Sequence, residues 1–286
     1  MIFDKDKKVF RYGEEQWVTC GDLLEALQQV GAADCDVLLL HTAMEFGMPA
    51  PGLKRQELAE IVFNTIQQLN VKTLVFPTFS FSFANHEDYD VNRSRSAMGL
   101  LNEYVRKRED AVRSLDPLMS VCVVGENKEL AEVSGDCSLG KGGFFDRLHH
   151  TENVKIAFFG VDEIICNTHL HYVEDYMNVP YRYNLEMSGK IIDADGNVFE
   201  DTHKLFVTYK HVTPYVKRDM YDELDAEGKM KKVSAGNASV SCFKEIDLFE
   251  KEKEQLEKDV NCFLAEPYDK YPLVKEFEYG GVHEVR

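Results

Sequence analysis

Short apolar runs that alternate with helix-period segments constrain the fold of this chain more than any other feature. The apolar runs are DVLLLH at 36–41, KTLVFP at 72–77, SVCVVG at 120–125 and VKIAFFG at 154–160. Aliphatic side chains at nearly every position of a short run are typical of strands buried on both faces. Helix-period segments at 53–69, 97–108 and 128–133 lie between the runs. The alternation predicts a three-layer α/β fold, in which helices flank a largely parallel sheet.

The pattern changes after residue 180. Residues 185–192, 204–210 and 230–242 have the character of strands joined by turns such as DADGN, which predicts an antiparallel C-terminal elaboration. Apolar residues at helical spacing across 245–264 predict an amphipathic closing helix. We therefore expect one domain, 1–286, with an α/β core at 1–183 and the antiparallel strands and closing helix at 184–286.

Polar segments follow three of the predicted strands. They read HTAMEFG from residue 41, PTFSFSFANHEDYD from residue 77 and CNTHLHYVED from residue 166. Ligands of open α/β sheets bind at the carboxyl ends of the strands. The sequence therefore predicts that these three loops form the rim of one site.

Composition narrows the class of protein. A net charge of −17 argues against nucleic-acid binding, and it means that an anionic cofactor needs a local pocket of N–H groups and basic side chains. No stretch approaches the roughly 20 apolar residues of a membrane helix, and the charged start MIFDKDKKVF does not match a signal peptide. Seven scattered cysteines without a CxxC pattern suit a reducing compartment. We expect a soluble cytoplasmic protein that binds neither nucleic acid nor membrane.

The CNTHLHYVED stretch allows three interpretations. His169 and His171 are spaced like a pair of metal ligands on a strand, but on the helix that the pattern predicts they point about 200° apart. On that helix His171 lies beside Glu174 or Asp175, and a carboxylate that accepts one imidazole N–H makes the other nitrogen a general base. The third interpretation is a polar helix start with a surface histidine. A nucleophilic Cys166 beside His169 is a further option without other support.

An ordered series of motifs decides between these interpretations. His-Thr-Ala stands at 41–43, Pro-Thr-Phe-Ser at 77–80, Met-Gly-Leu-Leu-Asn-Glu at 98–103 and Arg-Ser-Leu-Asp-Pro-Leu-Met-Ser at 113–120. Gly-Val at 160–161 precedes Asn-Thr-His-Leu-His-Tyr-Val-Glu at 167–174, and Pro-Tyr-Arg follows at 180–182. In this order, over about half of the chain, the set resembles the aminoglycoside 3-N-acetyltransferase family.

The resemblance implies an acyl-CoA-dependent N-acyltransferase that uses coenzyme A as co-substrate and no metal. It makes His171 the base that deprotonates the incoming amine, Glu174 the carboxylate that orients it, and Thr168 a group that stabilises the tetrahedral intermediate. His169 falls at a variable position, so the HxH pair is coincidental. Residues implied for the coenzyme A channel are His41, Thr42, Ala43, Thr78, Phe79, Arg113, Ser114 and Ser120. Residues expected to contact the acceptor are Arg93, Arg95, Asp116, Asp175 and Arg182.

Two departures from the family pattern concern the acceptor. Asp116 stands where the family has histidine, and 94–96 read Ser-Arg-Ser where the family has Thr-Pro-Ser. Arg93 and Arg95, close together in an acidic protein, suit phosphates of an acceptor. We therefore favour a nucleotide-linked amino sugar of glycan biosynthesis as the acceptor.

The alternative acceptor is an aminoglycoside antibiotic, which the net negative charge would attract and which would make the protein a resistance enzyme. A metal-dependent hydrolase and a non-catalytic binding module on the same scaffold are the other hypotheses. The expected partners are small molecules, an acyl-CoA donor and an amine acceptor, and a homo-oligomer is compatible with the sequence.

Overall fold

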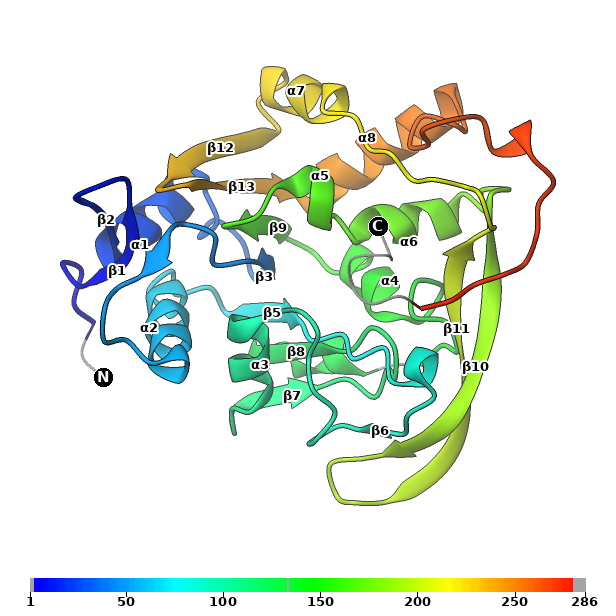
Figure 1. Ribbon diagram of the computed structural model, residues 1–286, viewed down its shortest axis with the longest axis horizontal. Coiled ribbons are helices and arrows are strands. Elements are labelled where there is room, and N and C mark those ends of the chain that lie inside the picture. The colour runs from blue at the N-terminus through cyan, green and yellow to red at the C-terminus, as the bar shows by residue number, and fades with distance from the viewer. Residues whose placement is uncertain (1–2, 133, 280–286) are drawn as a thin grey trace.

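A seven-stranded sheet organises the molecule (Figure 1), in a computed structural model that describes residues 3–132 and 134–279. Its three central strands run parallel: β9 (Val154–Phe159), β3 (Val37–Thr42) and β5 (Thr73–Pro77). Antiparallel strands complete both sides, with β13 (Ala238–Lys244) and β12 (Met230–Ala235) beyond β9, and β8 (Val121–Gly125) and β7 (Ala111–Arg113) beyond β5. The predicted three-layer α/β fold is confirmed, and its parallel part consists of the three strands that precede the polar loops.

Each face of the sheet has its own apolar core because alternate side chains of a strand point to opposite faces. In β3, Leu38 and Leu40 belong to one buried cluster, whereas Val37 and Leu39 belong to the other. The first face packs against α1 (Cys20–Gln29), α2 (Arg55–Gln67) and α3 (Leu100–Arg106). The second face packs against α4 (Phe144–His149), α6 (His169–Tyr176) and α8 (Glu245–Lys258). In Figure 1 these two groups of helices lie on either side of the central strands.

Smaller elements complete the fold. One sheet has the order β2-β1-β4, formed by Gln16–Thr19, Lys8–Tyr12 and Met48–Pro49. Another has the order β11-β10-β6, formed by Val198–Thr208, Arg182–Ile192 and Tyr89–Asp90, and its long β10–β11 ribbon runs along the edge of the molecule (Figure 1). The short helices are α5 (Glu163–Cys166), α7 (Asp219–Ala226) and the 3-10 turns η1 (Phe83–Asn85), η2 (Lys128–Ala131) and η3 (Tyr268–Lys270).

The boundaries differ from the sequence predictions in a few places. The helix expected from residue 97 begins only at Leu100, because Gly99 precedes it with φ +94°. The segment expected to be helical at 128–133 is a 3-10 turn at 128–131, and residue 133 lies outside the described residues. The N-terminal hairpin, α1, α4 and α7 were not predicted. Within the described ranges, none of the helices combines the length and hydropathy needed to cross a bilayer.

The C-terminal strands take a place that the sequence did not predict. β13 pairs directly with β9, so that residues 238–244 extend the central sheet instead of forming a separate addition. The β10–β11 ribbon does form a separate antiparallel pair, joined to the core through β6. A division at residue 183 therefore does not separate two structural units.

The fold makes one glycine between β9 and α5 indispensable. Gly160 has φ +71°, and a Cβ atom there would lie 2.2 Å from the carbonyl oxygen of Ala43. We expect Gly160→Ala to lower the free energy of unfolding in urea by more than about 3 kcal/mol, because left-handed strain and a backbone clash add. Gly196 has φ +86°, and a Cβ atom there would have no other atom within 4 Å, so Gly196→Ala is the matched control. It should cost only about 1 kcal/mol, and equal losses would contradict this account.

Candidate active site

The three polar loops meet, as predicted, around one cavity at the carboxyl edge of β9, β3 and β5. The cavity has a volume of about 590 Å³. Thr42 lines it at the end of β3, Phe79 lines it after β5, and Thr168 and His171 line it after β9. The adjacency of the three strands brings these segments together, although more than 120 residues separate the first from the last.

A buried carboxylate and an imidazole pair at one wall of this cavity. His171 and Glu174 are three residues apart on α6, so they share a face of the helix, and His171 Nδ1 lies 2.8 Å from Glu174 Oε2. Arg182, the first residue of β10, places its Nε 2.7 Å from the same oxygen, and Tyr181 donates to Glu174 Oε1 at 2.9 Å. Burial alone would raise the pKa of Glu174, but Arg182, His171 and Tyr181 outweigh it and hold that pKa below its usual range.

The two neighbours of His171 Nδ1 favour opposite tautomers, and the shorter contact is the one to Glu174. His171 Nδ1 lies between Glu174 Oε2 and Arg182 Nη2, which is 3.0 Å away. An ionised carboxylate only accepts hydrogen bonds, so the contact with Glu174 requires a proton on Nδ1. A guanidinium only donates, so a hydrogen bond from Arg182 would require Nδ1 without a proton. With its proton on Nδ1, His171 donates to Glu174, and the lone pair of Nε2 can accept a proton. That is the arrangement that a general base requires.

The neighbouring histidine has a different environment. His169 is completely buried, with Nδ1 2.9 Å from Glu252 Oε2 and Nε2 2.9 Å from Glu245 Oε1, both on α8. Burial lowers the pKa of His169, but the two carboxylates outweigh it and raise the pKa to about 9. Asn167 adds a hydrogen bond to Glu252 Oε1 at 2.5 Å. These contacts attach the start of α6 to the C-terminal helix.

Three of the residues predicted for the coenzyme A channel line the cavity. They are His41, Thr42 and Phe79. His41 is buried and stacks on Phe158, and burial, with His169 nearby, lowers its pKa to about 3, so the imidazole is neutral. Thr42 hydrogen-bonds to Asn102, whose side chain also donates to the Pro77 carbonyl at 2.6 Å. These bonds tie the ends of β3 and β5 to α3.

The remaining channel residues form the strand ends behind the cavity. Arg113 is buried and donates to the carbonyl oxygens of Val91, Ser94 and Thr78 and to Ser120 Oγ. Ser120 and Thr78 also hydrogen-bond to each other's carbonyl oxygens, Ser114 Oγ accepts from the Val121 N–H, and Ala43 N donates to Phe159 O. These bonds hold the strand ends behind the cavity in place, and contacts of these residues with coenzyme A stay a prediction.

The residues expected to contact the acceptor are dispersed. Arg182 lies at the His171–Glu174 pair, whereas Asp116 is buried elsewhere and accepts from the N–H groups of Leu118 and Met119 and from Ser138 Oγ. Asp175 is not part of the cavity lining; burial and the nearby Asp146 raise its pKa to about 6.

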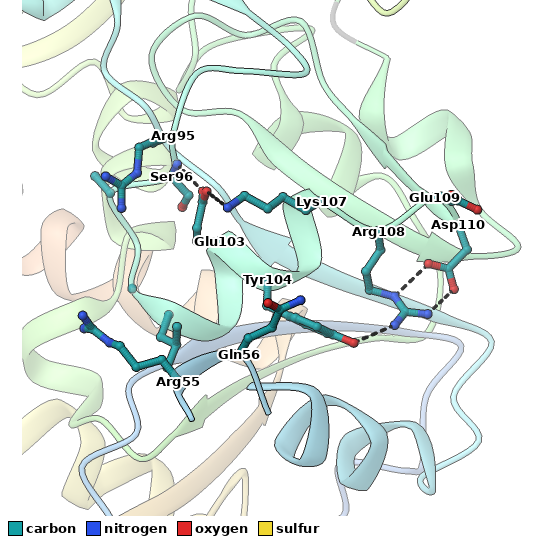
Figure 2. Close-up of a pocket in the computed structure, with 13 residues that line it drawn as sticks. Arg55, Gln56, Arg95, Ser96, Glu103, Tyr104, Lys107, Arg108, Glu109 and Asp110 are labelled. Atoms are coloured by element: carbon teal, nitrogen blue, oxygen red, sulfur yellow. Dashed lines mark hydrogen bonds and ion pairs between the residues drawn. The ribbon is translucent and has the colours of Figure 1, made fainter. Parts of the chain in front are cut away.

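The two arginines of the acceptor prediction also lie away from the cavity. Arg93 is 89% exposed, 3.7 Å from Asp90, and Arg95 lines a separate cleft, shown in Figure 2. Neither guanidinium is part of the lining around His171.

Sequence reasoning overlooked several residues of the site. Tyr181 and Asn102 lay inside the quoted motifs but had no role assigned to them. Two further residues of the site, Glu245 and Glu252, could have been found from the sequence. They are seven residues apart and therefore lie on the apolar face of α8, where a buried acid needs a basic or hydrogen-bonding partner. The C-terminal part also provides apolar wall residues that no pattern indicated: Leu205, Phe206, Val207, Pro214, Tyr215, Val216, Phe263 and Phe277.

The metal interpretation finds no geometric support. His169 and His171 diverge on α6, the first toward α8 and the second toward the cavity, so they do not converge on one ion. In the part of the chain that the structure describes, no group of three or more His, Cys, Asp or Glu side chains is arranged to hold a metal.

Comparisons with known proteins place this geometry in a family. The family model described as aminoglycoside 3-N-acetyltransferase matches residues 59–257. The chain belongs to this family. The prediction of an N-acyltransferase that uses coenzyme A as co-substrate is thereby confirmed. Among curated proteins, no sequence matches the chain significantly.

Several solved structures have a similar fold over most of this chain. The YokD protein from Bacillus subtilis is 17% identical, with a TM-score of 0.68 over 85% of this chain and 95% of its own. The aminoglycoside acetyltransferase AAC(3)-IVa in complex with gentamicin is 18% identical, with a TM-score of 0.71 over 92% and 96%. AAC-IIIb, in a binary complex with CoASH, is 18% identical, with a TM-score of 0.68 over 87% and 98%.

The buried imidazolium of this acetyltransferase predicts a dependence of stability on pH. The pKa of His169 is raised, so its contribution is complete below the unfolded value near 6.5 and is lost as the pH rises through about 9. We expect His169→Gln to lower the free energy of unfolding by about 3–5 kcal/mol at pH 6, since it leaves two buried carboxylates without their cation. The wild-type decline between pH 7 and 9.5 should become shallower in the variant.

Urea unfolding across this pH range measures both effects. His150, whose side chain is 71% exposed, provides the control variant His150→Gln, which should follow the wild type. An unchanged pH profile in His169→Gln would contradict the assignment of a charged His169.

Proposed function

We propose that the protein transfers an acetyl group from acetyl-coenzyme A to a primary amine of an aminoglycoside-type amino sugar, with His171 as the general base. The observation that carries this proposal is the His171–Glu174 pair, 2.8 Å apart, at the wall of a cavity formed by the loops after the three parallel strands. The residues match the family motif, and their geometry is what proton abstraction from an amine requires.

The chain's own groups account for each proton. His171 Nε2 takes a proton from the acceptor nitrogen while that nitrogen forms a bond to the thioester carbonyl carbon. Glu174, kept ionised by Arg182 and Tyr181, stabilises the imidazolium that results. When the carbon–sulfur bond breaks, His171 returns the proton to the departing sulfur, and the products are an amide and the free thiol of coenzyme A.

Thr168 is suited to stabilise the charge that develops on the carbonyl oxygen. It stands at the N-cap position of α6 and lines the cavity, but its side chain makes no capping hydrogen bond. Its hydroxyl can therefore donate to the thioester oxygen. The N-terminal turn of α6 contributes a positive partial charge at the same place.

The structure changes our preference for the acceptor. The sequence favours a nucleotide-linked sugar because Arg93 and Arg95 together suit phosphates, but both lie outside the cavity that contains His171. The argument for a nucleotide that rests on this pair of arginines therefore does not apply to the cavity. The negative net charge of the protein and its family favour a cationic amino sugar.

Replacement of the base tests the mechanism. We expect His171→Asn to lower kcat/KM on the order of 10²–10⁴-fold for every acceptor, because the proton then has no positioned acceptor. The measurement is thiol release from acetyl-coenzyme A with an aminoglycoside panel and, in parallel, nucleotide-linked amino sugars.

Tyr176→Phe changes an exposed side chain on the same helix and should leave turnover unchanged. Retention of wild-type turnover in His171→Asn would refute the role of this histidine. Turnover with the nucleotide-linked sugars alone would refute the acceptor class but not the mechanism.

A further inference from the structure

One wall of the cavity around His171 is apolar, and the proton transfers proposed above do not require it. The apolar wall consists of residues 205–207 near the end of β11, residues 214–216, Phe263 and Phe277. Apart from the hydroxyl group of Tyr215, these side chains have no polar atoms. So large an apolar surface beside a catalytic base indicates a ligand with an apolar part.

The apolar wall begins beside the catalytic pair. Arg182, which pairs with the catalytic carboxylate, donates through Nη1 to the carbonyl oxygen of Phe206 at 3.0 Å. The Tyr215 N–H donates to the carbonyl oxygen of Phe263 at 2.7 Å, and this bond joins two parts of the wall. A molecule whose amine reaches His171 therefore lies next to apolar surface.

Contacts with Lys210 hold Phe277 at the cavity. The backbone N–H of Lys210 donates to the carbonyl oxygen of Val274 at 3.0 Å, and Lys210 Nζ lies 2.6 Å from Glu276 Oε1. Phe263 and Phe277 both follow residue 257, the last one that the family model matches. Membership of the family therefore does not determine this part of the wall.

The described lining offers no second carboxylate for another ammonium group of an acceptor. In the part of the lining that the structure describes, Glu174 is the only acidic side chain, and it is buried and paired with Arg182. An ammonium group that loses its water without a new partner is costly to bury. The net charge of −17 thus attracts a cation from a distance, whereas the cavity suits only the amine that reacts at His171.

The position of the apolar wall associates it with the acceptor. The residues expected to hold the acyl donor are at the ends of β3, β5, β7 and β8, whereas the wall comes from β11 and the segments after it. In Figure 1, α6 lies between the ends of β3 and β5 and the β10–β11 ribbon. His171 on α6 therefore has the expected donor site on one side and the apolar wall on the other.

We infer that the acceptor is an amphipathic amino sugar, with its reacting amine at His171 and an apolar substituent, an alkyl or aromatic aglycone, against the apolar wall. Phe277 and Val216 then determine specificity for that substituent. This inference rests on the proposed acyl transfer and narrows its acceptor class. Each methylene group that leaves water at such a wall strengthens binding about fourfold. The wall thus supplies the binding energy that ion pairs would supply for a polycation.

A matched series of acceptors tests this inference. The series comprises the methyl and hexyl glycosides of glucosamine and of 3-amino-3-deoxyglucose, with gentamicin as the polycation. Acetyl-coenzyme A is the donor, and hexanoyl-coenzyme A replaces it in a second set of assays. Thiol release gives kcat/KM, and titration calorimetry at several temperatures measures binding without turnover.

The variants change the apolar wall in opposite ways. Phe277→Ala removes a ring from it, and Val216→Glu adds a carboxylate. Both side chains are half-buried, so neither replacement opens the core. Phe199→Ala is the matched control, because Phe199 is exposed on the β10–β11 ribbon and does not line the cavity.

For the wild type we expect kcat/KM to be higher with the hexyl than with the methyl glycosides, on the order of 10²-fold. Binding of the hexyl glycosides should have a negative heat-capacity change, which marks burial of apolar surface. Phe277→Ala should reduce the hexyl preference about tenfold, because part of the alkyl chain then stays in water. Val216→Glu should also reduce it and should raise kcat/KM for gentamicin, whose ammonium groups gain a partner. Phe199→Ala should retain the wild-type preference.

The outcomes separate this inference from the proposed function. Thiol release without a hexyl preference, or with gentamicin preferred to the hexyl glycosides, upholds the proposed function and overturns the apolar acceptor. If Phe277→Ala changes the preference for hexanoyl over acetyl but leaves the acceptor preference unchanged, the wall belongs to the donor, and the inference is also overturned. Hexyl-selective binding that depends on Phe277 but gives no thiol release upholds the apolar site and overturns the proposed function.

Discussion

Glu174 is a buried carboxylate, and the catalytic arrangement depends on the three donors that keep it ionised. One donor comes from its own helix, one from the turn before β10, and one from β10 itself. Removal of one partner from a buried ion pair costs about 3–5 kcal/mol, so each donor also holds its element in place. The contacts that stabilise the fold here therefore also hold the imidazole of His171 in its place at the cavity wall.

A second buried cluster fixes the same helix from its other side. His169 connects the first turn of α6 to Glu245 and Glu252 on α8, while His171 faces the cavity. The two histidines of one motif therefore have different partners and different roles. One is a charged structural group between two helices, and the other places its imidazole beside Glu174 at the cavity.

Local patterns in the sequence predicted the sheet and the His171–Glu174 pair, because burial of a strand and the i,i+3 spacing of a helix are properties of short segments. The place of β13 beside β9 was not predictable in this way. The two strands are about 80 residues apart, and the sequence of neither strand indicates which strand it pairs with. The surroundings of Arg113 were not predictable from the sequence for the same reason. Its type and motif suggest anion binding, but its four hydrogen bonds go to groups brought near only by the fold.

The position of β13 has a consequence for synthesis of the chain. The three parallel strands are complete once residue 159 has left the ribosome. One edge of β9 is then unpaired, and it stays unpaired until residues 238–244 have been synthesised. An apolar strand with open N–H and C=O groups is a template for intermolecular pairing. A nascent chain that carries every catalytic residue is therefore aggregation-prone, and the last third of the polypeptide protects the part that performs the chemistry.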